Sequence, residues 1–530
     1  MAYLLHQLLE KSAQNYPDIT AIIDLDKTVT YRELDALANQ LANALKNCGV
    51  CKGDRVGICL ERSLECIAAI YGILKAGAAY VPLDPSAPDD RTGFCIENCQ
   101  IKVLVTTNQK LISLSKYEDN KIGKYINCAI VTDSRQETEL TASKVITWDE
   151  VLASSPELIP VSAIDADIAH ILYTSGSTGQ PKGVMASHRY SLNFASCFYE
   201  CLQVQPGERM THQLPIYFGA SIVDLFTIIQ AAATMVIVPS ELLFFPSELA
   251  AFIEAQRINL WFAVPSTLTQ VVLRGNLDKY RLPDLRAIMF GGEVFQVKYL
   301  RQLIELLPHV KYCNIYGSTE TGARTYYLFD QLSPEMQVVP LGKACENSEL
   351  FMVNDSGEVI TTPEEIGELY ARGSSVMKGY WGLPEKTAEV LVPYTLHEYI
   401  GEEIVFRTGD MVKRDAAGNY VYVGRRDRMI KSRGYRIELG EIETIIHNHP
   451  QVEEVAAIAI PDDEIGNRIK AVVVPRQGSN LQKIELQSFC NQYLPKYMIP
   501  EIIEFSQSLP KTPTGKIDRV SLAKCSNPQS

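Results

Sequence analysis

Short apolar segments alternate along this chain with longer amphipathic ones. Runs rich in β-branched residues predict strands over residues 55–60, 101–105, 168–172, 234–238 and 287–290. Between them, apolar residues recurring every three or four positions predict helices over residues 31–47, 64–76, 247–256 and 297–307. Strands that alternate with helices favour an α/β fold with a substantial share of parallel sheet.

The last hundred residues follow a different pattern. Beyond Gly424 the spacing predicts a helix at 438–448, strands at 452–460 and 471–474, and a helix at 483–493. A segment of this length is enough for a small separate domain. We therefore expect a large N-terminal domain of parallel-rich sheets and helices over residues 1–426, and a small mobile α+β domain over 427–530. Residues 133–160 are polar and their pattern is less regular, which indicates a segment that extends over the surface.

Composition narrows the class of protein. The 530 residues exceed one ordinary hydrophobic core, and 46% hydrophobic with 21% charged residues is typical of a globular chain. A net charge of −13 argues against a nucleic-acid partner. The N-terminus lacks the pattern of a signal peptide and no apolar stretch is long enough to span a bilayer, so we expect a cytoplasmic protein without a membrane partner. The thirteen cysteines are expected to be buried free thiols.

A loop of hydroxyls and glycines follows the predicted strand at 168–172. Its candidate ligands are Thr174, Ser175, Gly176, Ser177, Thr178 and Lys182. Glycines let the backbone approach an anion, while hydroxyls and a lysine add donors suited to a triphosphate. The common phosphate loop needs Gly-Lys-Ser/Thr, whereas this chain has Gln180-Pro181-Lys182. A flexible surface turn is the alternative interpretation.

Two further segments carry candidate chemistry. In residues 311–321 a strand ends in a turn where Tyr316 can stack on a purine, Asn314 can bond to its edge and Glu320 can hold Mg²⁺. A helix cap is the alternative there. Asp410 follows a glycine and can accept both ribose hydroxyls, or it can belong to a simple β-turn.

The C-terminal part adds a charge run over residues 424–443 and a lysine in a Pro/Gly-rich loop. The charge run falls on the proposed domain junction, although such runs are usually solvated surface. Lys516 lies in the loop at 509–519, where a lysine is often only a solvent-exposed charge.

Taken in order, these segments resemble the adenylation domains of nonribosomal peptide synthetases, within the acyl-adenylate-forming superfamily. Further matches are residues 30–34, 74–85 and 367–373, and the resemblance runs from about residue 5 to 520. It implies a two-step ligase in which ATP and a carboxylic acid give an acyl-adenylate and pyrophosphate, after which the acyl group passes to a thiol.

The resemblance also implies residue roles. Phosphates would be held by Thr174, Ser175, Gly176, Ser177, Thr178 and Lys182, the remaining nucleotide contacts by Gly291, Asn314, Tyr316, Gly317, Ser318 and Thr319, and the ribose by Asp410 and Arg425. Glu320 would bind Mg²⁺ and Lys516 would bridge the substrate carboxylate and the nucleotide. Lys516 suits that role because a placed cation stabilises the charge that builds at the α-phosphorus. Asp427 resembles the hinge about which the small domain rotates between half-reactions.

The expected acceptor is the phosphopantetheine thiol of a separate carrier protein. Little sequence precedes the first motif and eleven residues follow Arg519, so we expect a stand-alone enzyme that serves its carrier protein in trans. Coenzyme A as the acceptor, in an acyl-CoA ligase, is one alternative. A catalytically inactive binding homologue is another.

The acid pocket departs from the family pattern. By resemblance it would be lined by Phe218, Gly219, Ala220, Val223, Ala263, Ile288, Phe290, Ile315, Ala323 and Arg324. Members that activate amino acids usually have Asp where this chain has Gly219, and that carboxylate pairs with the substrate ammonium. Either the small carboxylic or amino acid lacks an α-amino group, or Asp224 or Glu293 replaces the missing carboxylate. Arg324 would meet a polar or anionic substrate group, or point to solvent.

Overall fold

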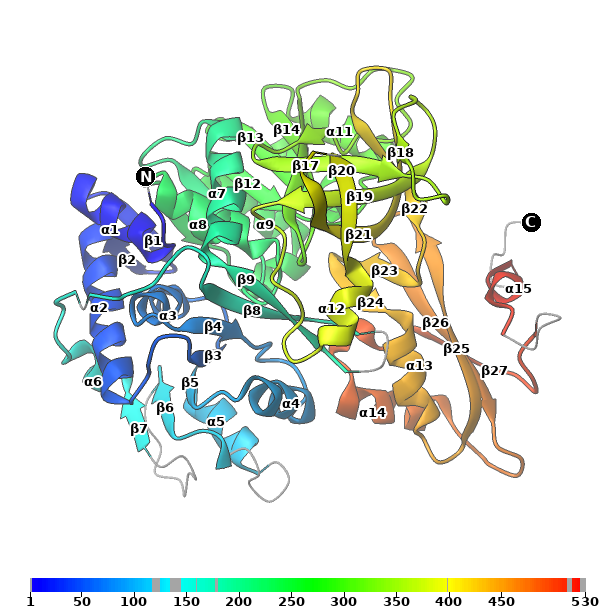
Figure 1. Cartoon of the computed structure of the whole chain (residues 1–530), viewed down its shortest axis with the longest axis horizontal. Coiled ribbons are helices and arrows are strands. Elements are labelled where there is room, and N and C mark those ends of the chain that lie inside the picture. The colour runs from blue at the N-terminus through cyan, green and yellow to red at the C-terminus, as the bar shows by residue number, and fades with distance from the viewer. Residues whose placement is uncertain are drawn as a thin grey trace.

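The computed structural model of the chain describes residues 2–116, 124–133, 144–158, 160–176, 180–397, 399–511 and 517–524 (Figure 1). Three predicted site residues, Ser177, Thr178 and Lys516, lie outside these ranges. For Ala323 only the backbone is described.

The first sheet has seven strands in the order β7-β6-β5-β3-β4-β8-β9. They are β3 (Arg55–Cys59), β4 (Ala79–Pro82), β5 (Val103–Thr106), β6 (Cys128–Val131), β7 (Lys144–Thr147), β8 (Ile168–Thr174) and β9 (Lys182–Ser187). All neighbours pair in parallel except β8 and β9, which are antiparallel and carry the hydroxyl-rich loop between them. The helices of this region are α2 (Tyr31–Asn47), α3 (Leu64–Lys75), α4 (Asp89–Cys99), α5 (Asn108–Ser115) and α6 (Trp148–Leu152).

The second sheet has nine strands in the order β16-β15-β14-β13-β12-β10-β11-β1-β2. They are β1 (Thr20–Asp24), β2 (Lys27–Thr30), β10 (Arg209–His212), β11 (Thr234–Ile237), β12 (Leu260–Ala263), β13 (Ala287–Gly291), β14 (Lys311–Ser318), β15 (Gly322–Phe329) and β16 (Lys343–Ala344). Its helices are α1 (His6–Asn15), α7 (His188–Leu202), α8 (Ser221–Gln230), α9 (Pro246–Ala255), α10 (Pro265–Arg274) and α11 (Val297–Leu306). One apolar cluster joins α2, α3, α7 and α8 to strands of both sheets, so the two sheets share a core.

A third, antiparallel sheet follows. Its strands are β17 (Ser348–Val353), β18 (Val359–Ile360), β19 (Gly367–Gly373), β20 (Leu391–His397), β21 (Gly401–Arg414) and β22 (Tyr420–Arg425), with α12 (Pro384–Val390) between β19 and β20. The long strand β21 pairs with β19, β20 and β22, which places Asp410 opposite Arg425.

The C-terminal part begins with a hairpin of β23 (Met429–Ser432) and β24 (Tyr435–Glu438). It continues with α13 (Leu439–His447), β25 (Val452–Asp462), β26 (Gly466–Pro475), α14 (Lys483–Tyr493), β27 (Ile502–Phe505) and α15 (Arg519–Lys524). Residues between Ile437 and Ile503 form a buried cluster of their own. In Figure 1 these elements stand on the side of the molecule opposite the N-terminus. The expected α/β fold with a large N-terminal and a smaller C-terminal domain is confirmed.

The predicted elements agree with the structure where periodicity was strong. The helix predicted at 31–47 is α2, which begins at a capping box formed by Thr30 and Glu33. The segment expected to be less regular and on the surface, 133–160, contains β7, which pairs with β6, and α6 directly after it, and most of its described residues are exposed. Among the described residues, no helix is long and apolar enough to cross a membrane.

Candidate active site

One cavity of about 490 Å³ collects most of the predicted site residues. The β8–β9 loop, the start of α8, the end of β14, strand β21 and the β23–β24 hairpin all contribute to its wall. The predicted residues that line it are Thr174, Ser175, Lys182, Phe218, Gly219, Ala220, Val223, Gly291, Ile315, Gly317, Ser318, Thr319, Glu320, Asp410, Arg425 and Asp427. Segments separated by more than 250 residues thus meet at one site.

Other predicted residues are not among the described residues that line the cavity. Of these, Ala263, Ile288 and Phe290 belong to a buried apolar cluster. Asn314 donates a hydrogen bond from Nδ2 to the carbonyl of Pro340 at 2.8 Å, which occupies its amide. The nucleotide and pocket roles of these residues stay predictions.

Glu320 is almost fully buried and holds a cation from the C-terminal part. Arg436 Nη1 donates to both of its carboxylate oxygens, and the Tyr380 hydroxyl donates to Oε1 at 2.9 Å. Burial alone would raise the pKa of the Glu320 carboxyl, but Arg436 and Lys182 outweigh it and lower that pKa to about 2. The carboxylate is therefore charged at neutral pH, and its oxygens are the ligand type that Mg²⁺ prefers.

Arg425 joins two of the predicted residues. Its Nη1 lies 2.6 Å from Asp410 Oδ1, and its Nε lies 2.7 Å from Asp427 Oδ1. The Tyr316 hydroxyl donates to the other oxygen of Asp410 at 2.5 Å, so the two oxygens of Asp410 are both engaged. The proposed ribose ligand and the proposed hinge are thus connected through one guanidinium.

The described part of the hydroxyl-rich loop contacts the C-terminal part directly. The Ser175 hydroxyl donates to the carbonyl of Arg436 at 3.1 Å, and the Gly176 amide donates to Glu441 Oε2 at 3.2 Å. Glu441 is 1% exposed and also forms an ion pair with Arg91 of α4. A carboxylate therefore accepts from a backbone N–H that the sequence assigns to phosphate binding.

The flanks of Lys516 lie away from this cavity. Lys511 and Ile517 form an isolated bridge, and Lys511 Nζ lies 2.6 Å from Glu454 Oε1 of β25. Ile517 packs against an apolar cluster on β25 and β26. The described residues next to the proposed catalytic lysine thus contact the C-terminal sheet of β25 and β26. The residues of this part that line the cavity include those of the β23–β24 hairpin.

Arg324 does not point to solvent. Its side chain is fully buried, and its Nη1 donates to the Ser348 hydroxyl at 3.1 Å. Burial lowers the pKa of this guanidinium to about 10. The solvent-facing alternative for Arg324 is therefore wrong, and the side chain is not among the described residues that line the cavity.

The two carboxylates suggested as replacements at the pocket are engaged elsewhere. Asp224 is fully buried and its Oδ2 lies 2.9 Å from His212 Nδ1. Glu293 accepts from the amide of Ser266 at 3.1 Å and from that of Gly434 at 2.5 Å. Burial raises the pKa of both carboxyl groups.

Sequence reasoning did not single out Arg436, Glu441, Tyr380 or Arg91. The first two lie within the charge run at 424–443, and that run is the sequence feature from which they could have been identified as candidates. Their partners could not be inferred, because each contact joins residues far apart in the chain.

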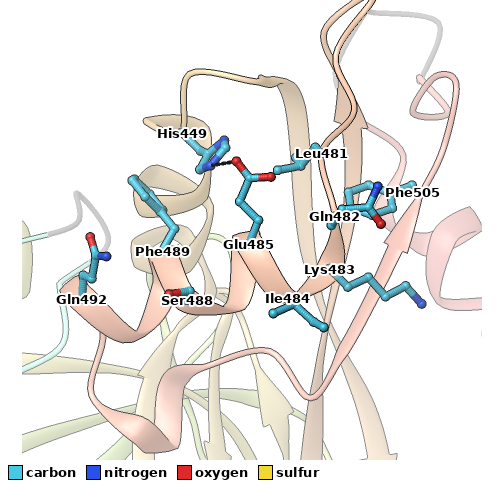
Figure 2. Close-up of a pocket in the computed structure, with 10 residues that line it drawn as sticks. All are labelled: His449, Leu481, Gln482, Lys483, Ile484, Glu485, Ser488, Phe489, Gln492 and Phe505. Carbon is cyan, nitrogen blue, oxygen red and sulfur yellow. Dashed lines mark ion pairs between the residues drawn. The ribbon is translucent and has the colours of Figure 1, made fainter.

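A second hollow of about 1090 Å³ lies on the C-terminal part beside α14. Figure 2 shows Glu485 and Phe489 of α14 facing His449, with Glu485 Oε1 3.8 Å from His449 Nε2. None of the predicted site residues that the structure describes lines this hollow.

Comparisons with known proteins identify the family of the chain. Residues 9–381 match the AMP-binding enzyme family, and residues 441–516 match the AMP-binding enzyme C-terminal domain. The chain belongs to the AMP-binding enzyme family. The resemblance to adenylation domains is confirmed, and the enzyme class that it implies is an ATP-dependent, adenylate-forming acid–thiol ligase.

Two relatives and one solved structure illustrate the similarity. The chain is 33% identical to the L-proline–[L-prolyl-carrier protein] ligase of Pseudomonas fluorescens, over 98% of this chain and 99% of the relative. It is 34% identical to the dimodular nonribosomal peptide synthase of Bacillus subtilis, over 98% of this chain but only 21% of that protein. The crystal structure of IdnL1 matches with a TM-score of 0.79 at 26% identity, covering 96% of this chain and 99% of that one.

Proposed function

We propose that this enzyme adenylates a small carboxylic or amino acid with ATP and transfers the acyl group to the phosphopantetheine thiol of a carrier protein. One observation carries the proposal: the hydroxyl-rich loop, Glu320 and Asp410 converge on a single cavity. A similar ligase that loads a carrier protein matches the chain over nearly its full length and supports this acceptor. A role in the biosynthesis of a secondary metabolite follows from such a partner.

In this proposal different lining residues bind different parts of the nucleotide. Thr174, Ser175 and Lys182 hold phosphate oxygens, while Asp410 accepts from the ribose hydroxyls. Magnesium would be held by the Glu320 carboxylate and would neutralise phosphate charge there. The ion pair between Glu320 and Arg436 supports this fit, because it shows a site that already accepts positive charge.

The C-terminal part is proposed to alternate between two positions. We propose a domain boundary between residues 426 and 427, with Asp427 as the pivot and Lys516 entering the cavity for adenylation. The contacts of Arg436 and Glu441 with the N-terminal part would then belong to the arrangement in which Lys516 is withdrawn. The expected cytoplasmic location stays a prediction.

Two assays test the proposal. Acid-dependent exchange of labelled pyrophosphate into ATP should occur with wild-type enzyme and should be lost on chelating Mg²⁺. Glu320→Gln should lower the rate by on the order of 10²-fold, because it removes a charged ligand at the phosphates. Transfer to a phosphopantetheinylated carrier protein should exceed transfer to coenzyme A, and the reverse order would favour an acyl-CoA ligase.

A further inference from the structure

One end of the cavity is apolar. Phe194 of α7, Val223 of α8, Phe262 of β12 and Ile315 of β14 all line it and all belong to the same buried apolar cluster. Ala220 packs against that cluster from the start of α8. A wall of this kind binds apolar ligand groups by excluding water.

The space beside Gly219 in the cavity is filled by a neutral group. A Cβ atom placed on Gly219 would lie 2.8 Å from the Thr319 hydroxyl and 3.1 Å from the Thr319 Cα. The space that an acidic side chain at residue 219 would enter is thus taken by threonine. The hydroxyl offers an uncharged hydrogen-bonding group at this point.

Each carboxylate that lines the cavity already has a cationic partner from the protein. The pairs are Glu320 with Arg436, Glu368 with Arg407 and Arg426, Glu389 with Lys386, Asp410 with Arg425, Asp427 with Arg425, and Glu438 with Arg436. Asp224 and Glu293 do not line the cavity. Asp224 Oδ2 is held by His212 while its buried Oδ1 has no hydrogen-bond partner among the described residues, and Glu293 accepts from two backbone amides. In this arrangement, an ammonium group in the apolar end would therefore compete with existing partners for each carboxylate that lines the cavity.

We infer that the acid activated here carries an apolar remainder and no α-ammonium group. The inference rests on the proposed function and narrows its substrate class to 2-oxo, 2-hydroxy or unsubstituted apolar acids. A buried ammonium is strongly disfavoured unless it is paired and hydrogen-bonded, whereas a neutral oxygen at the second carbon can accept from the Thr319 hydroxyl.

A binding experiment on the wild-type enzyme tests the substrate class without requiring turnover. The probes are acyl-sulfamoyl adenosines, stable analogues of the acyl-adenylate, made in matched sets on a valine and on a phenylalanine skeleton. Each set carries an amino, a hydroxyl, an oxo or no group at the second carbon. Titration calorimetry should show at least one uncharged member binding on the order of 10²-fold more tightly than its amino counterpart. Comparable affinities within both sets, or a preference for the amino form, would overturn the inference.

Pyrophosphate exchange with the parent acids separates the inference from the proposed function. Faster exchange with amino acids than with all their uncharged counterparts would overturn the inference and leave the ligase activity intact. Exchange with none of the acids, together with a retained binding preference for uncharged probes, would overturn the proposed function alone.

A matched pair of variants adds a second readout. Val223 is fully buried in the apolar wall, and Val223→Asp and Val223→Asn are close in size but differ in charge. Relative to Val223→Asn, Val223→Asp should shift the amino-to-uncharged affinity ratio toward the amino probe by tenfold or more. An unchanged ratio would show that the wall does not face the second carbon and would overturn the assignment.

Discussion

Arg436 Nη1 lies 2.6 Å and 2.8 Å from the two carboxylate oxygens of Glu320. The guanidinium comes from the C-terminal hairpin and the carboxylate from the turn after β14, so one ion pair connects the two parts of the enzyme. Because Glu320 is the predicted magnesium ligand, Arg436 and the metal would compete for the same oxygens.

Replacing Arg436 should make magnesium easier to bind. Arg436→Met removes the competing charge, and a charge-assisted hydrogen bond contributes about 1.5–3 kcal/mol. We expect the Mg²⁺ concentration for half-maximal pyrophosphate exchange to fall roughly tenfold. Arg433→Met is the matched control, because Arg433 pairs with Glu501 outside the cavity. An unchanged Mg²⁺ requirement would refute the competition.

The loop lysine should serve only the first half-reaction. Lys516→Ala is expected to slow adenylate formation by on the order of 10²–10³-fold, the loss typical of removing one charge-stabilising donor. Transfer from a preformed adenylate should change much less. Lys511→Ala, which breaks an ion pair with Glu454 beside the same loop, should leave both steps near wild type. Equal losses in both half-reactions would remove Lys516 from the proposed role.

Restricting the backbone at Asp427 should separate the half-reactions. Proline fixes φ near roughly −65° and also restricts the preceding residue, so Asp427→Pro should trap one arrangement and block one step selectively. Asp427→Ala removes the same ion pair with Arg425 but leaves φ free, which makes it the control. Single-turnover assays of both steps provide the measurement. Wild-type rates in Asp427→Pro would exclude this residue as the pivot.

Any side chain at residue 219 must displace Thr319. The new Cβ would lie 2.8 Å from the Thr319 hydroxyl, so Gly219→Ala should lower exchange by about tenfold, consistent with overpacking costs of about 1–3 kcal/mol. Gly219→Asp carries the same steric cost and adds a carboxylate. Relative to Gly219→Ala, it should favour α-amino acids in pyrophosphate exchange. Identical acid preferences in the two variants would show that residue 219 does not face the α-substituent.

Buried histidines should make the N-terminal part sensitive to mild acid. Burial lowers the pKa values of His6 and His170 to about 3 and that of His188 to about 4. An unfolded histidine titrates near a pKa of about 6.5, so the unfolded state binds more protons below that pH and stability falls as the pH drops toward 4. Each group contributes up to roughly 1.4 kcal/mol per pH unit.

Urea unfolding at several pH values between 7.5 and 4.5 measures this slope. His170→Gln should reduce it by about a third, since it removes one of the three titrating groups. His447→Gln, at an exposed position on α13, should not change it. A slope that is the same in all three proteins would contradict the prediction.

Periodicity identified the helices that bury one face. The helix α2 buries Leu34, Leu41 and Leu45 on one face, and such spacing is visible in the sequence. The sheet of β17 to β22 was not predicted, because its strands are partly exposed and their pairing across hairpins is not encoded in any single segment. In β21, for example, only five of the fourteen residues are buried.

In the candidate site, too, features within one segment could be predicted from the sequence, whereas contacts between distant segments could not. Glu320 and Asp410 were predicted from the distinctive residue types of their turns, and both line the cavity. Arg436 was not identified as a partner, since its contact with Glu320 depends on how the C-terminal part is placed against a residue 116 positions earlier. The obstruction beside Gly219 likewise depends on Thr319, a residue one hundred positions later.

In the proposed two-position mechanism, the contact between Glu441 and the Gly176 amide would set an order of events. A phosphate group and the Glu441 carboxylate carry the same sign of charge and would need the same N–H, so they cannot occupy the loop together. Under that mechanism, pyrophosphate would have to leave before helix α13 reaches this position. With the helix in place, pyrophosphate would be kept from returning to attack the adenylate, and the activated acid would be committed to the thiol.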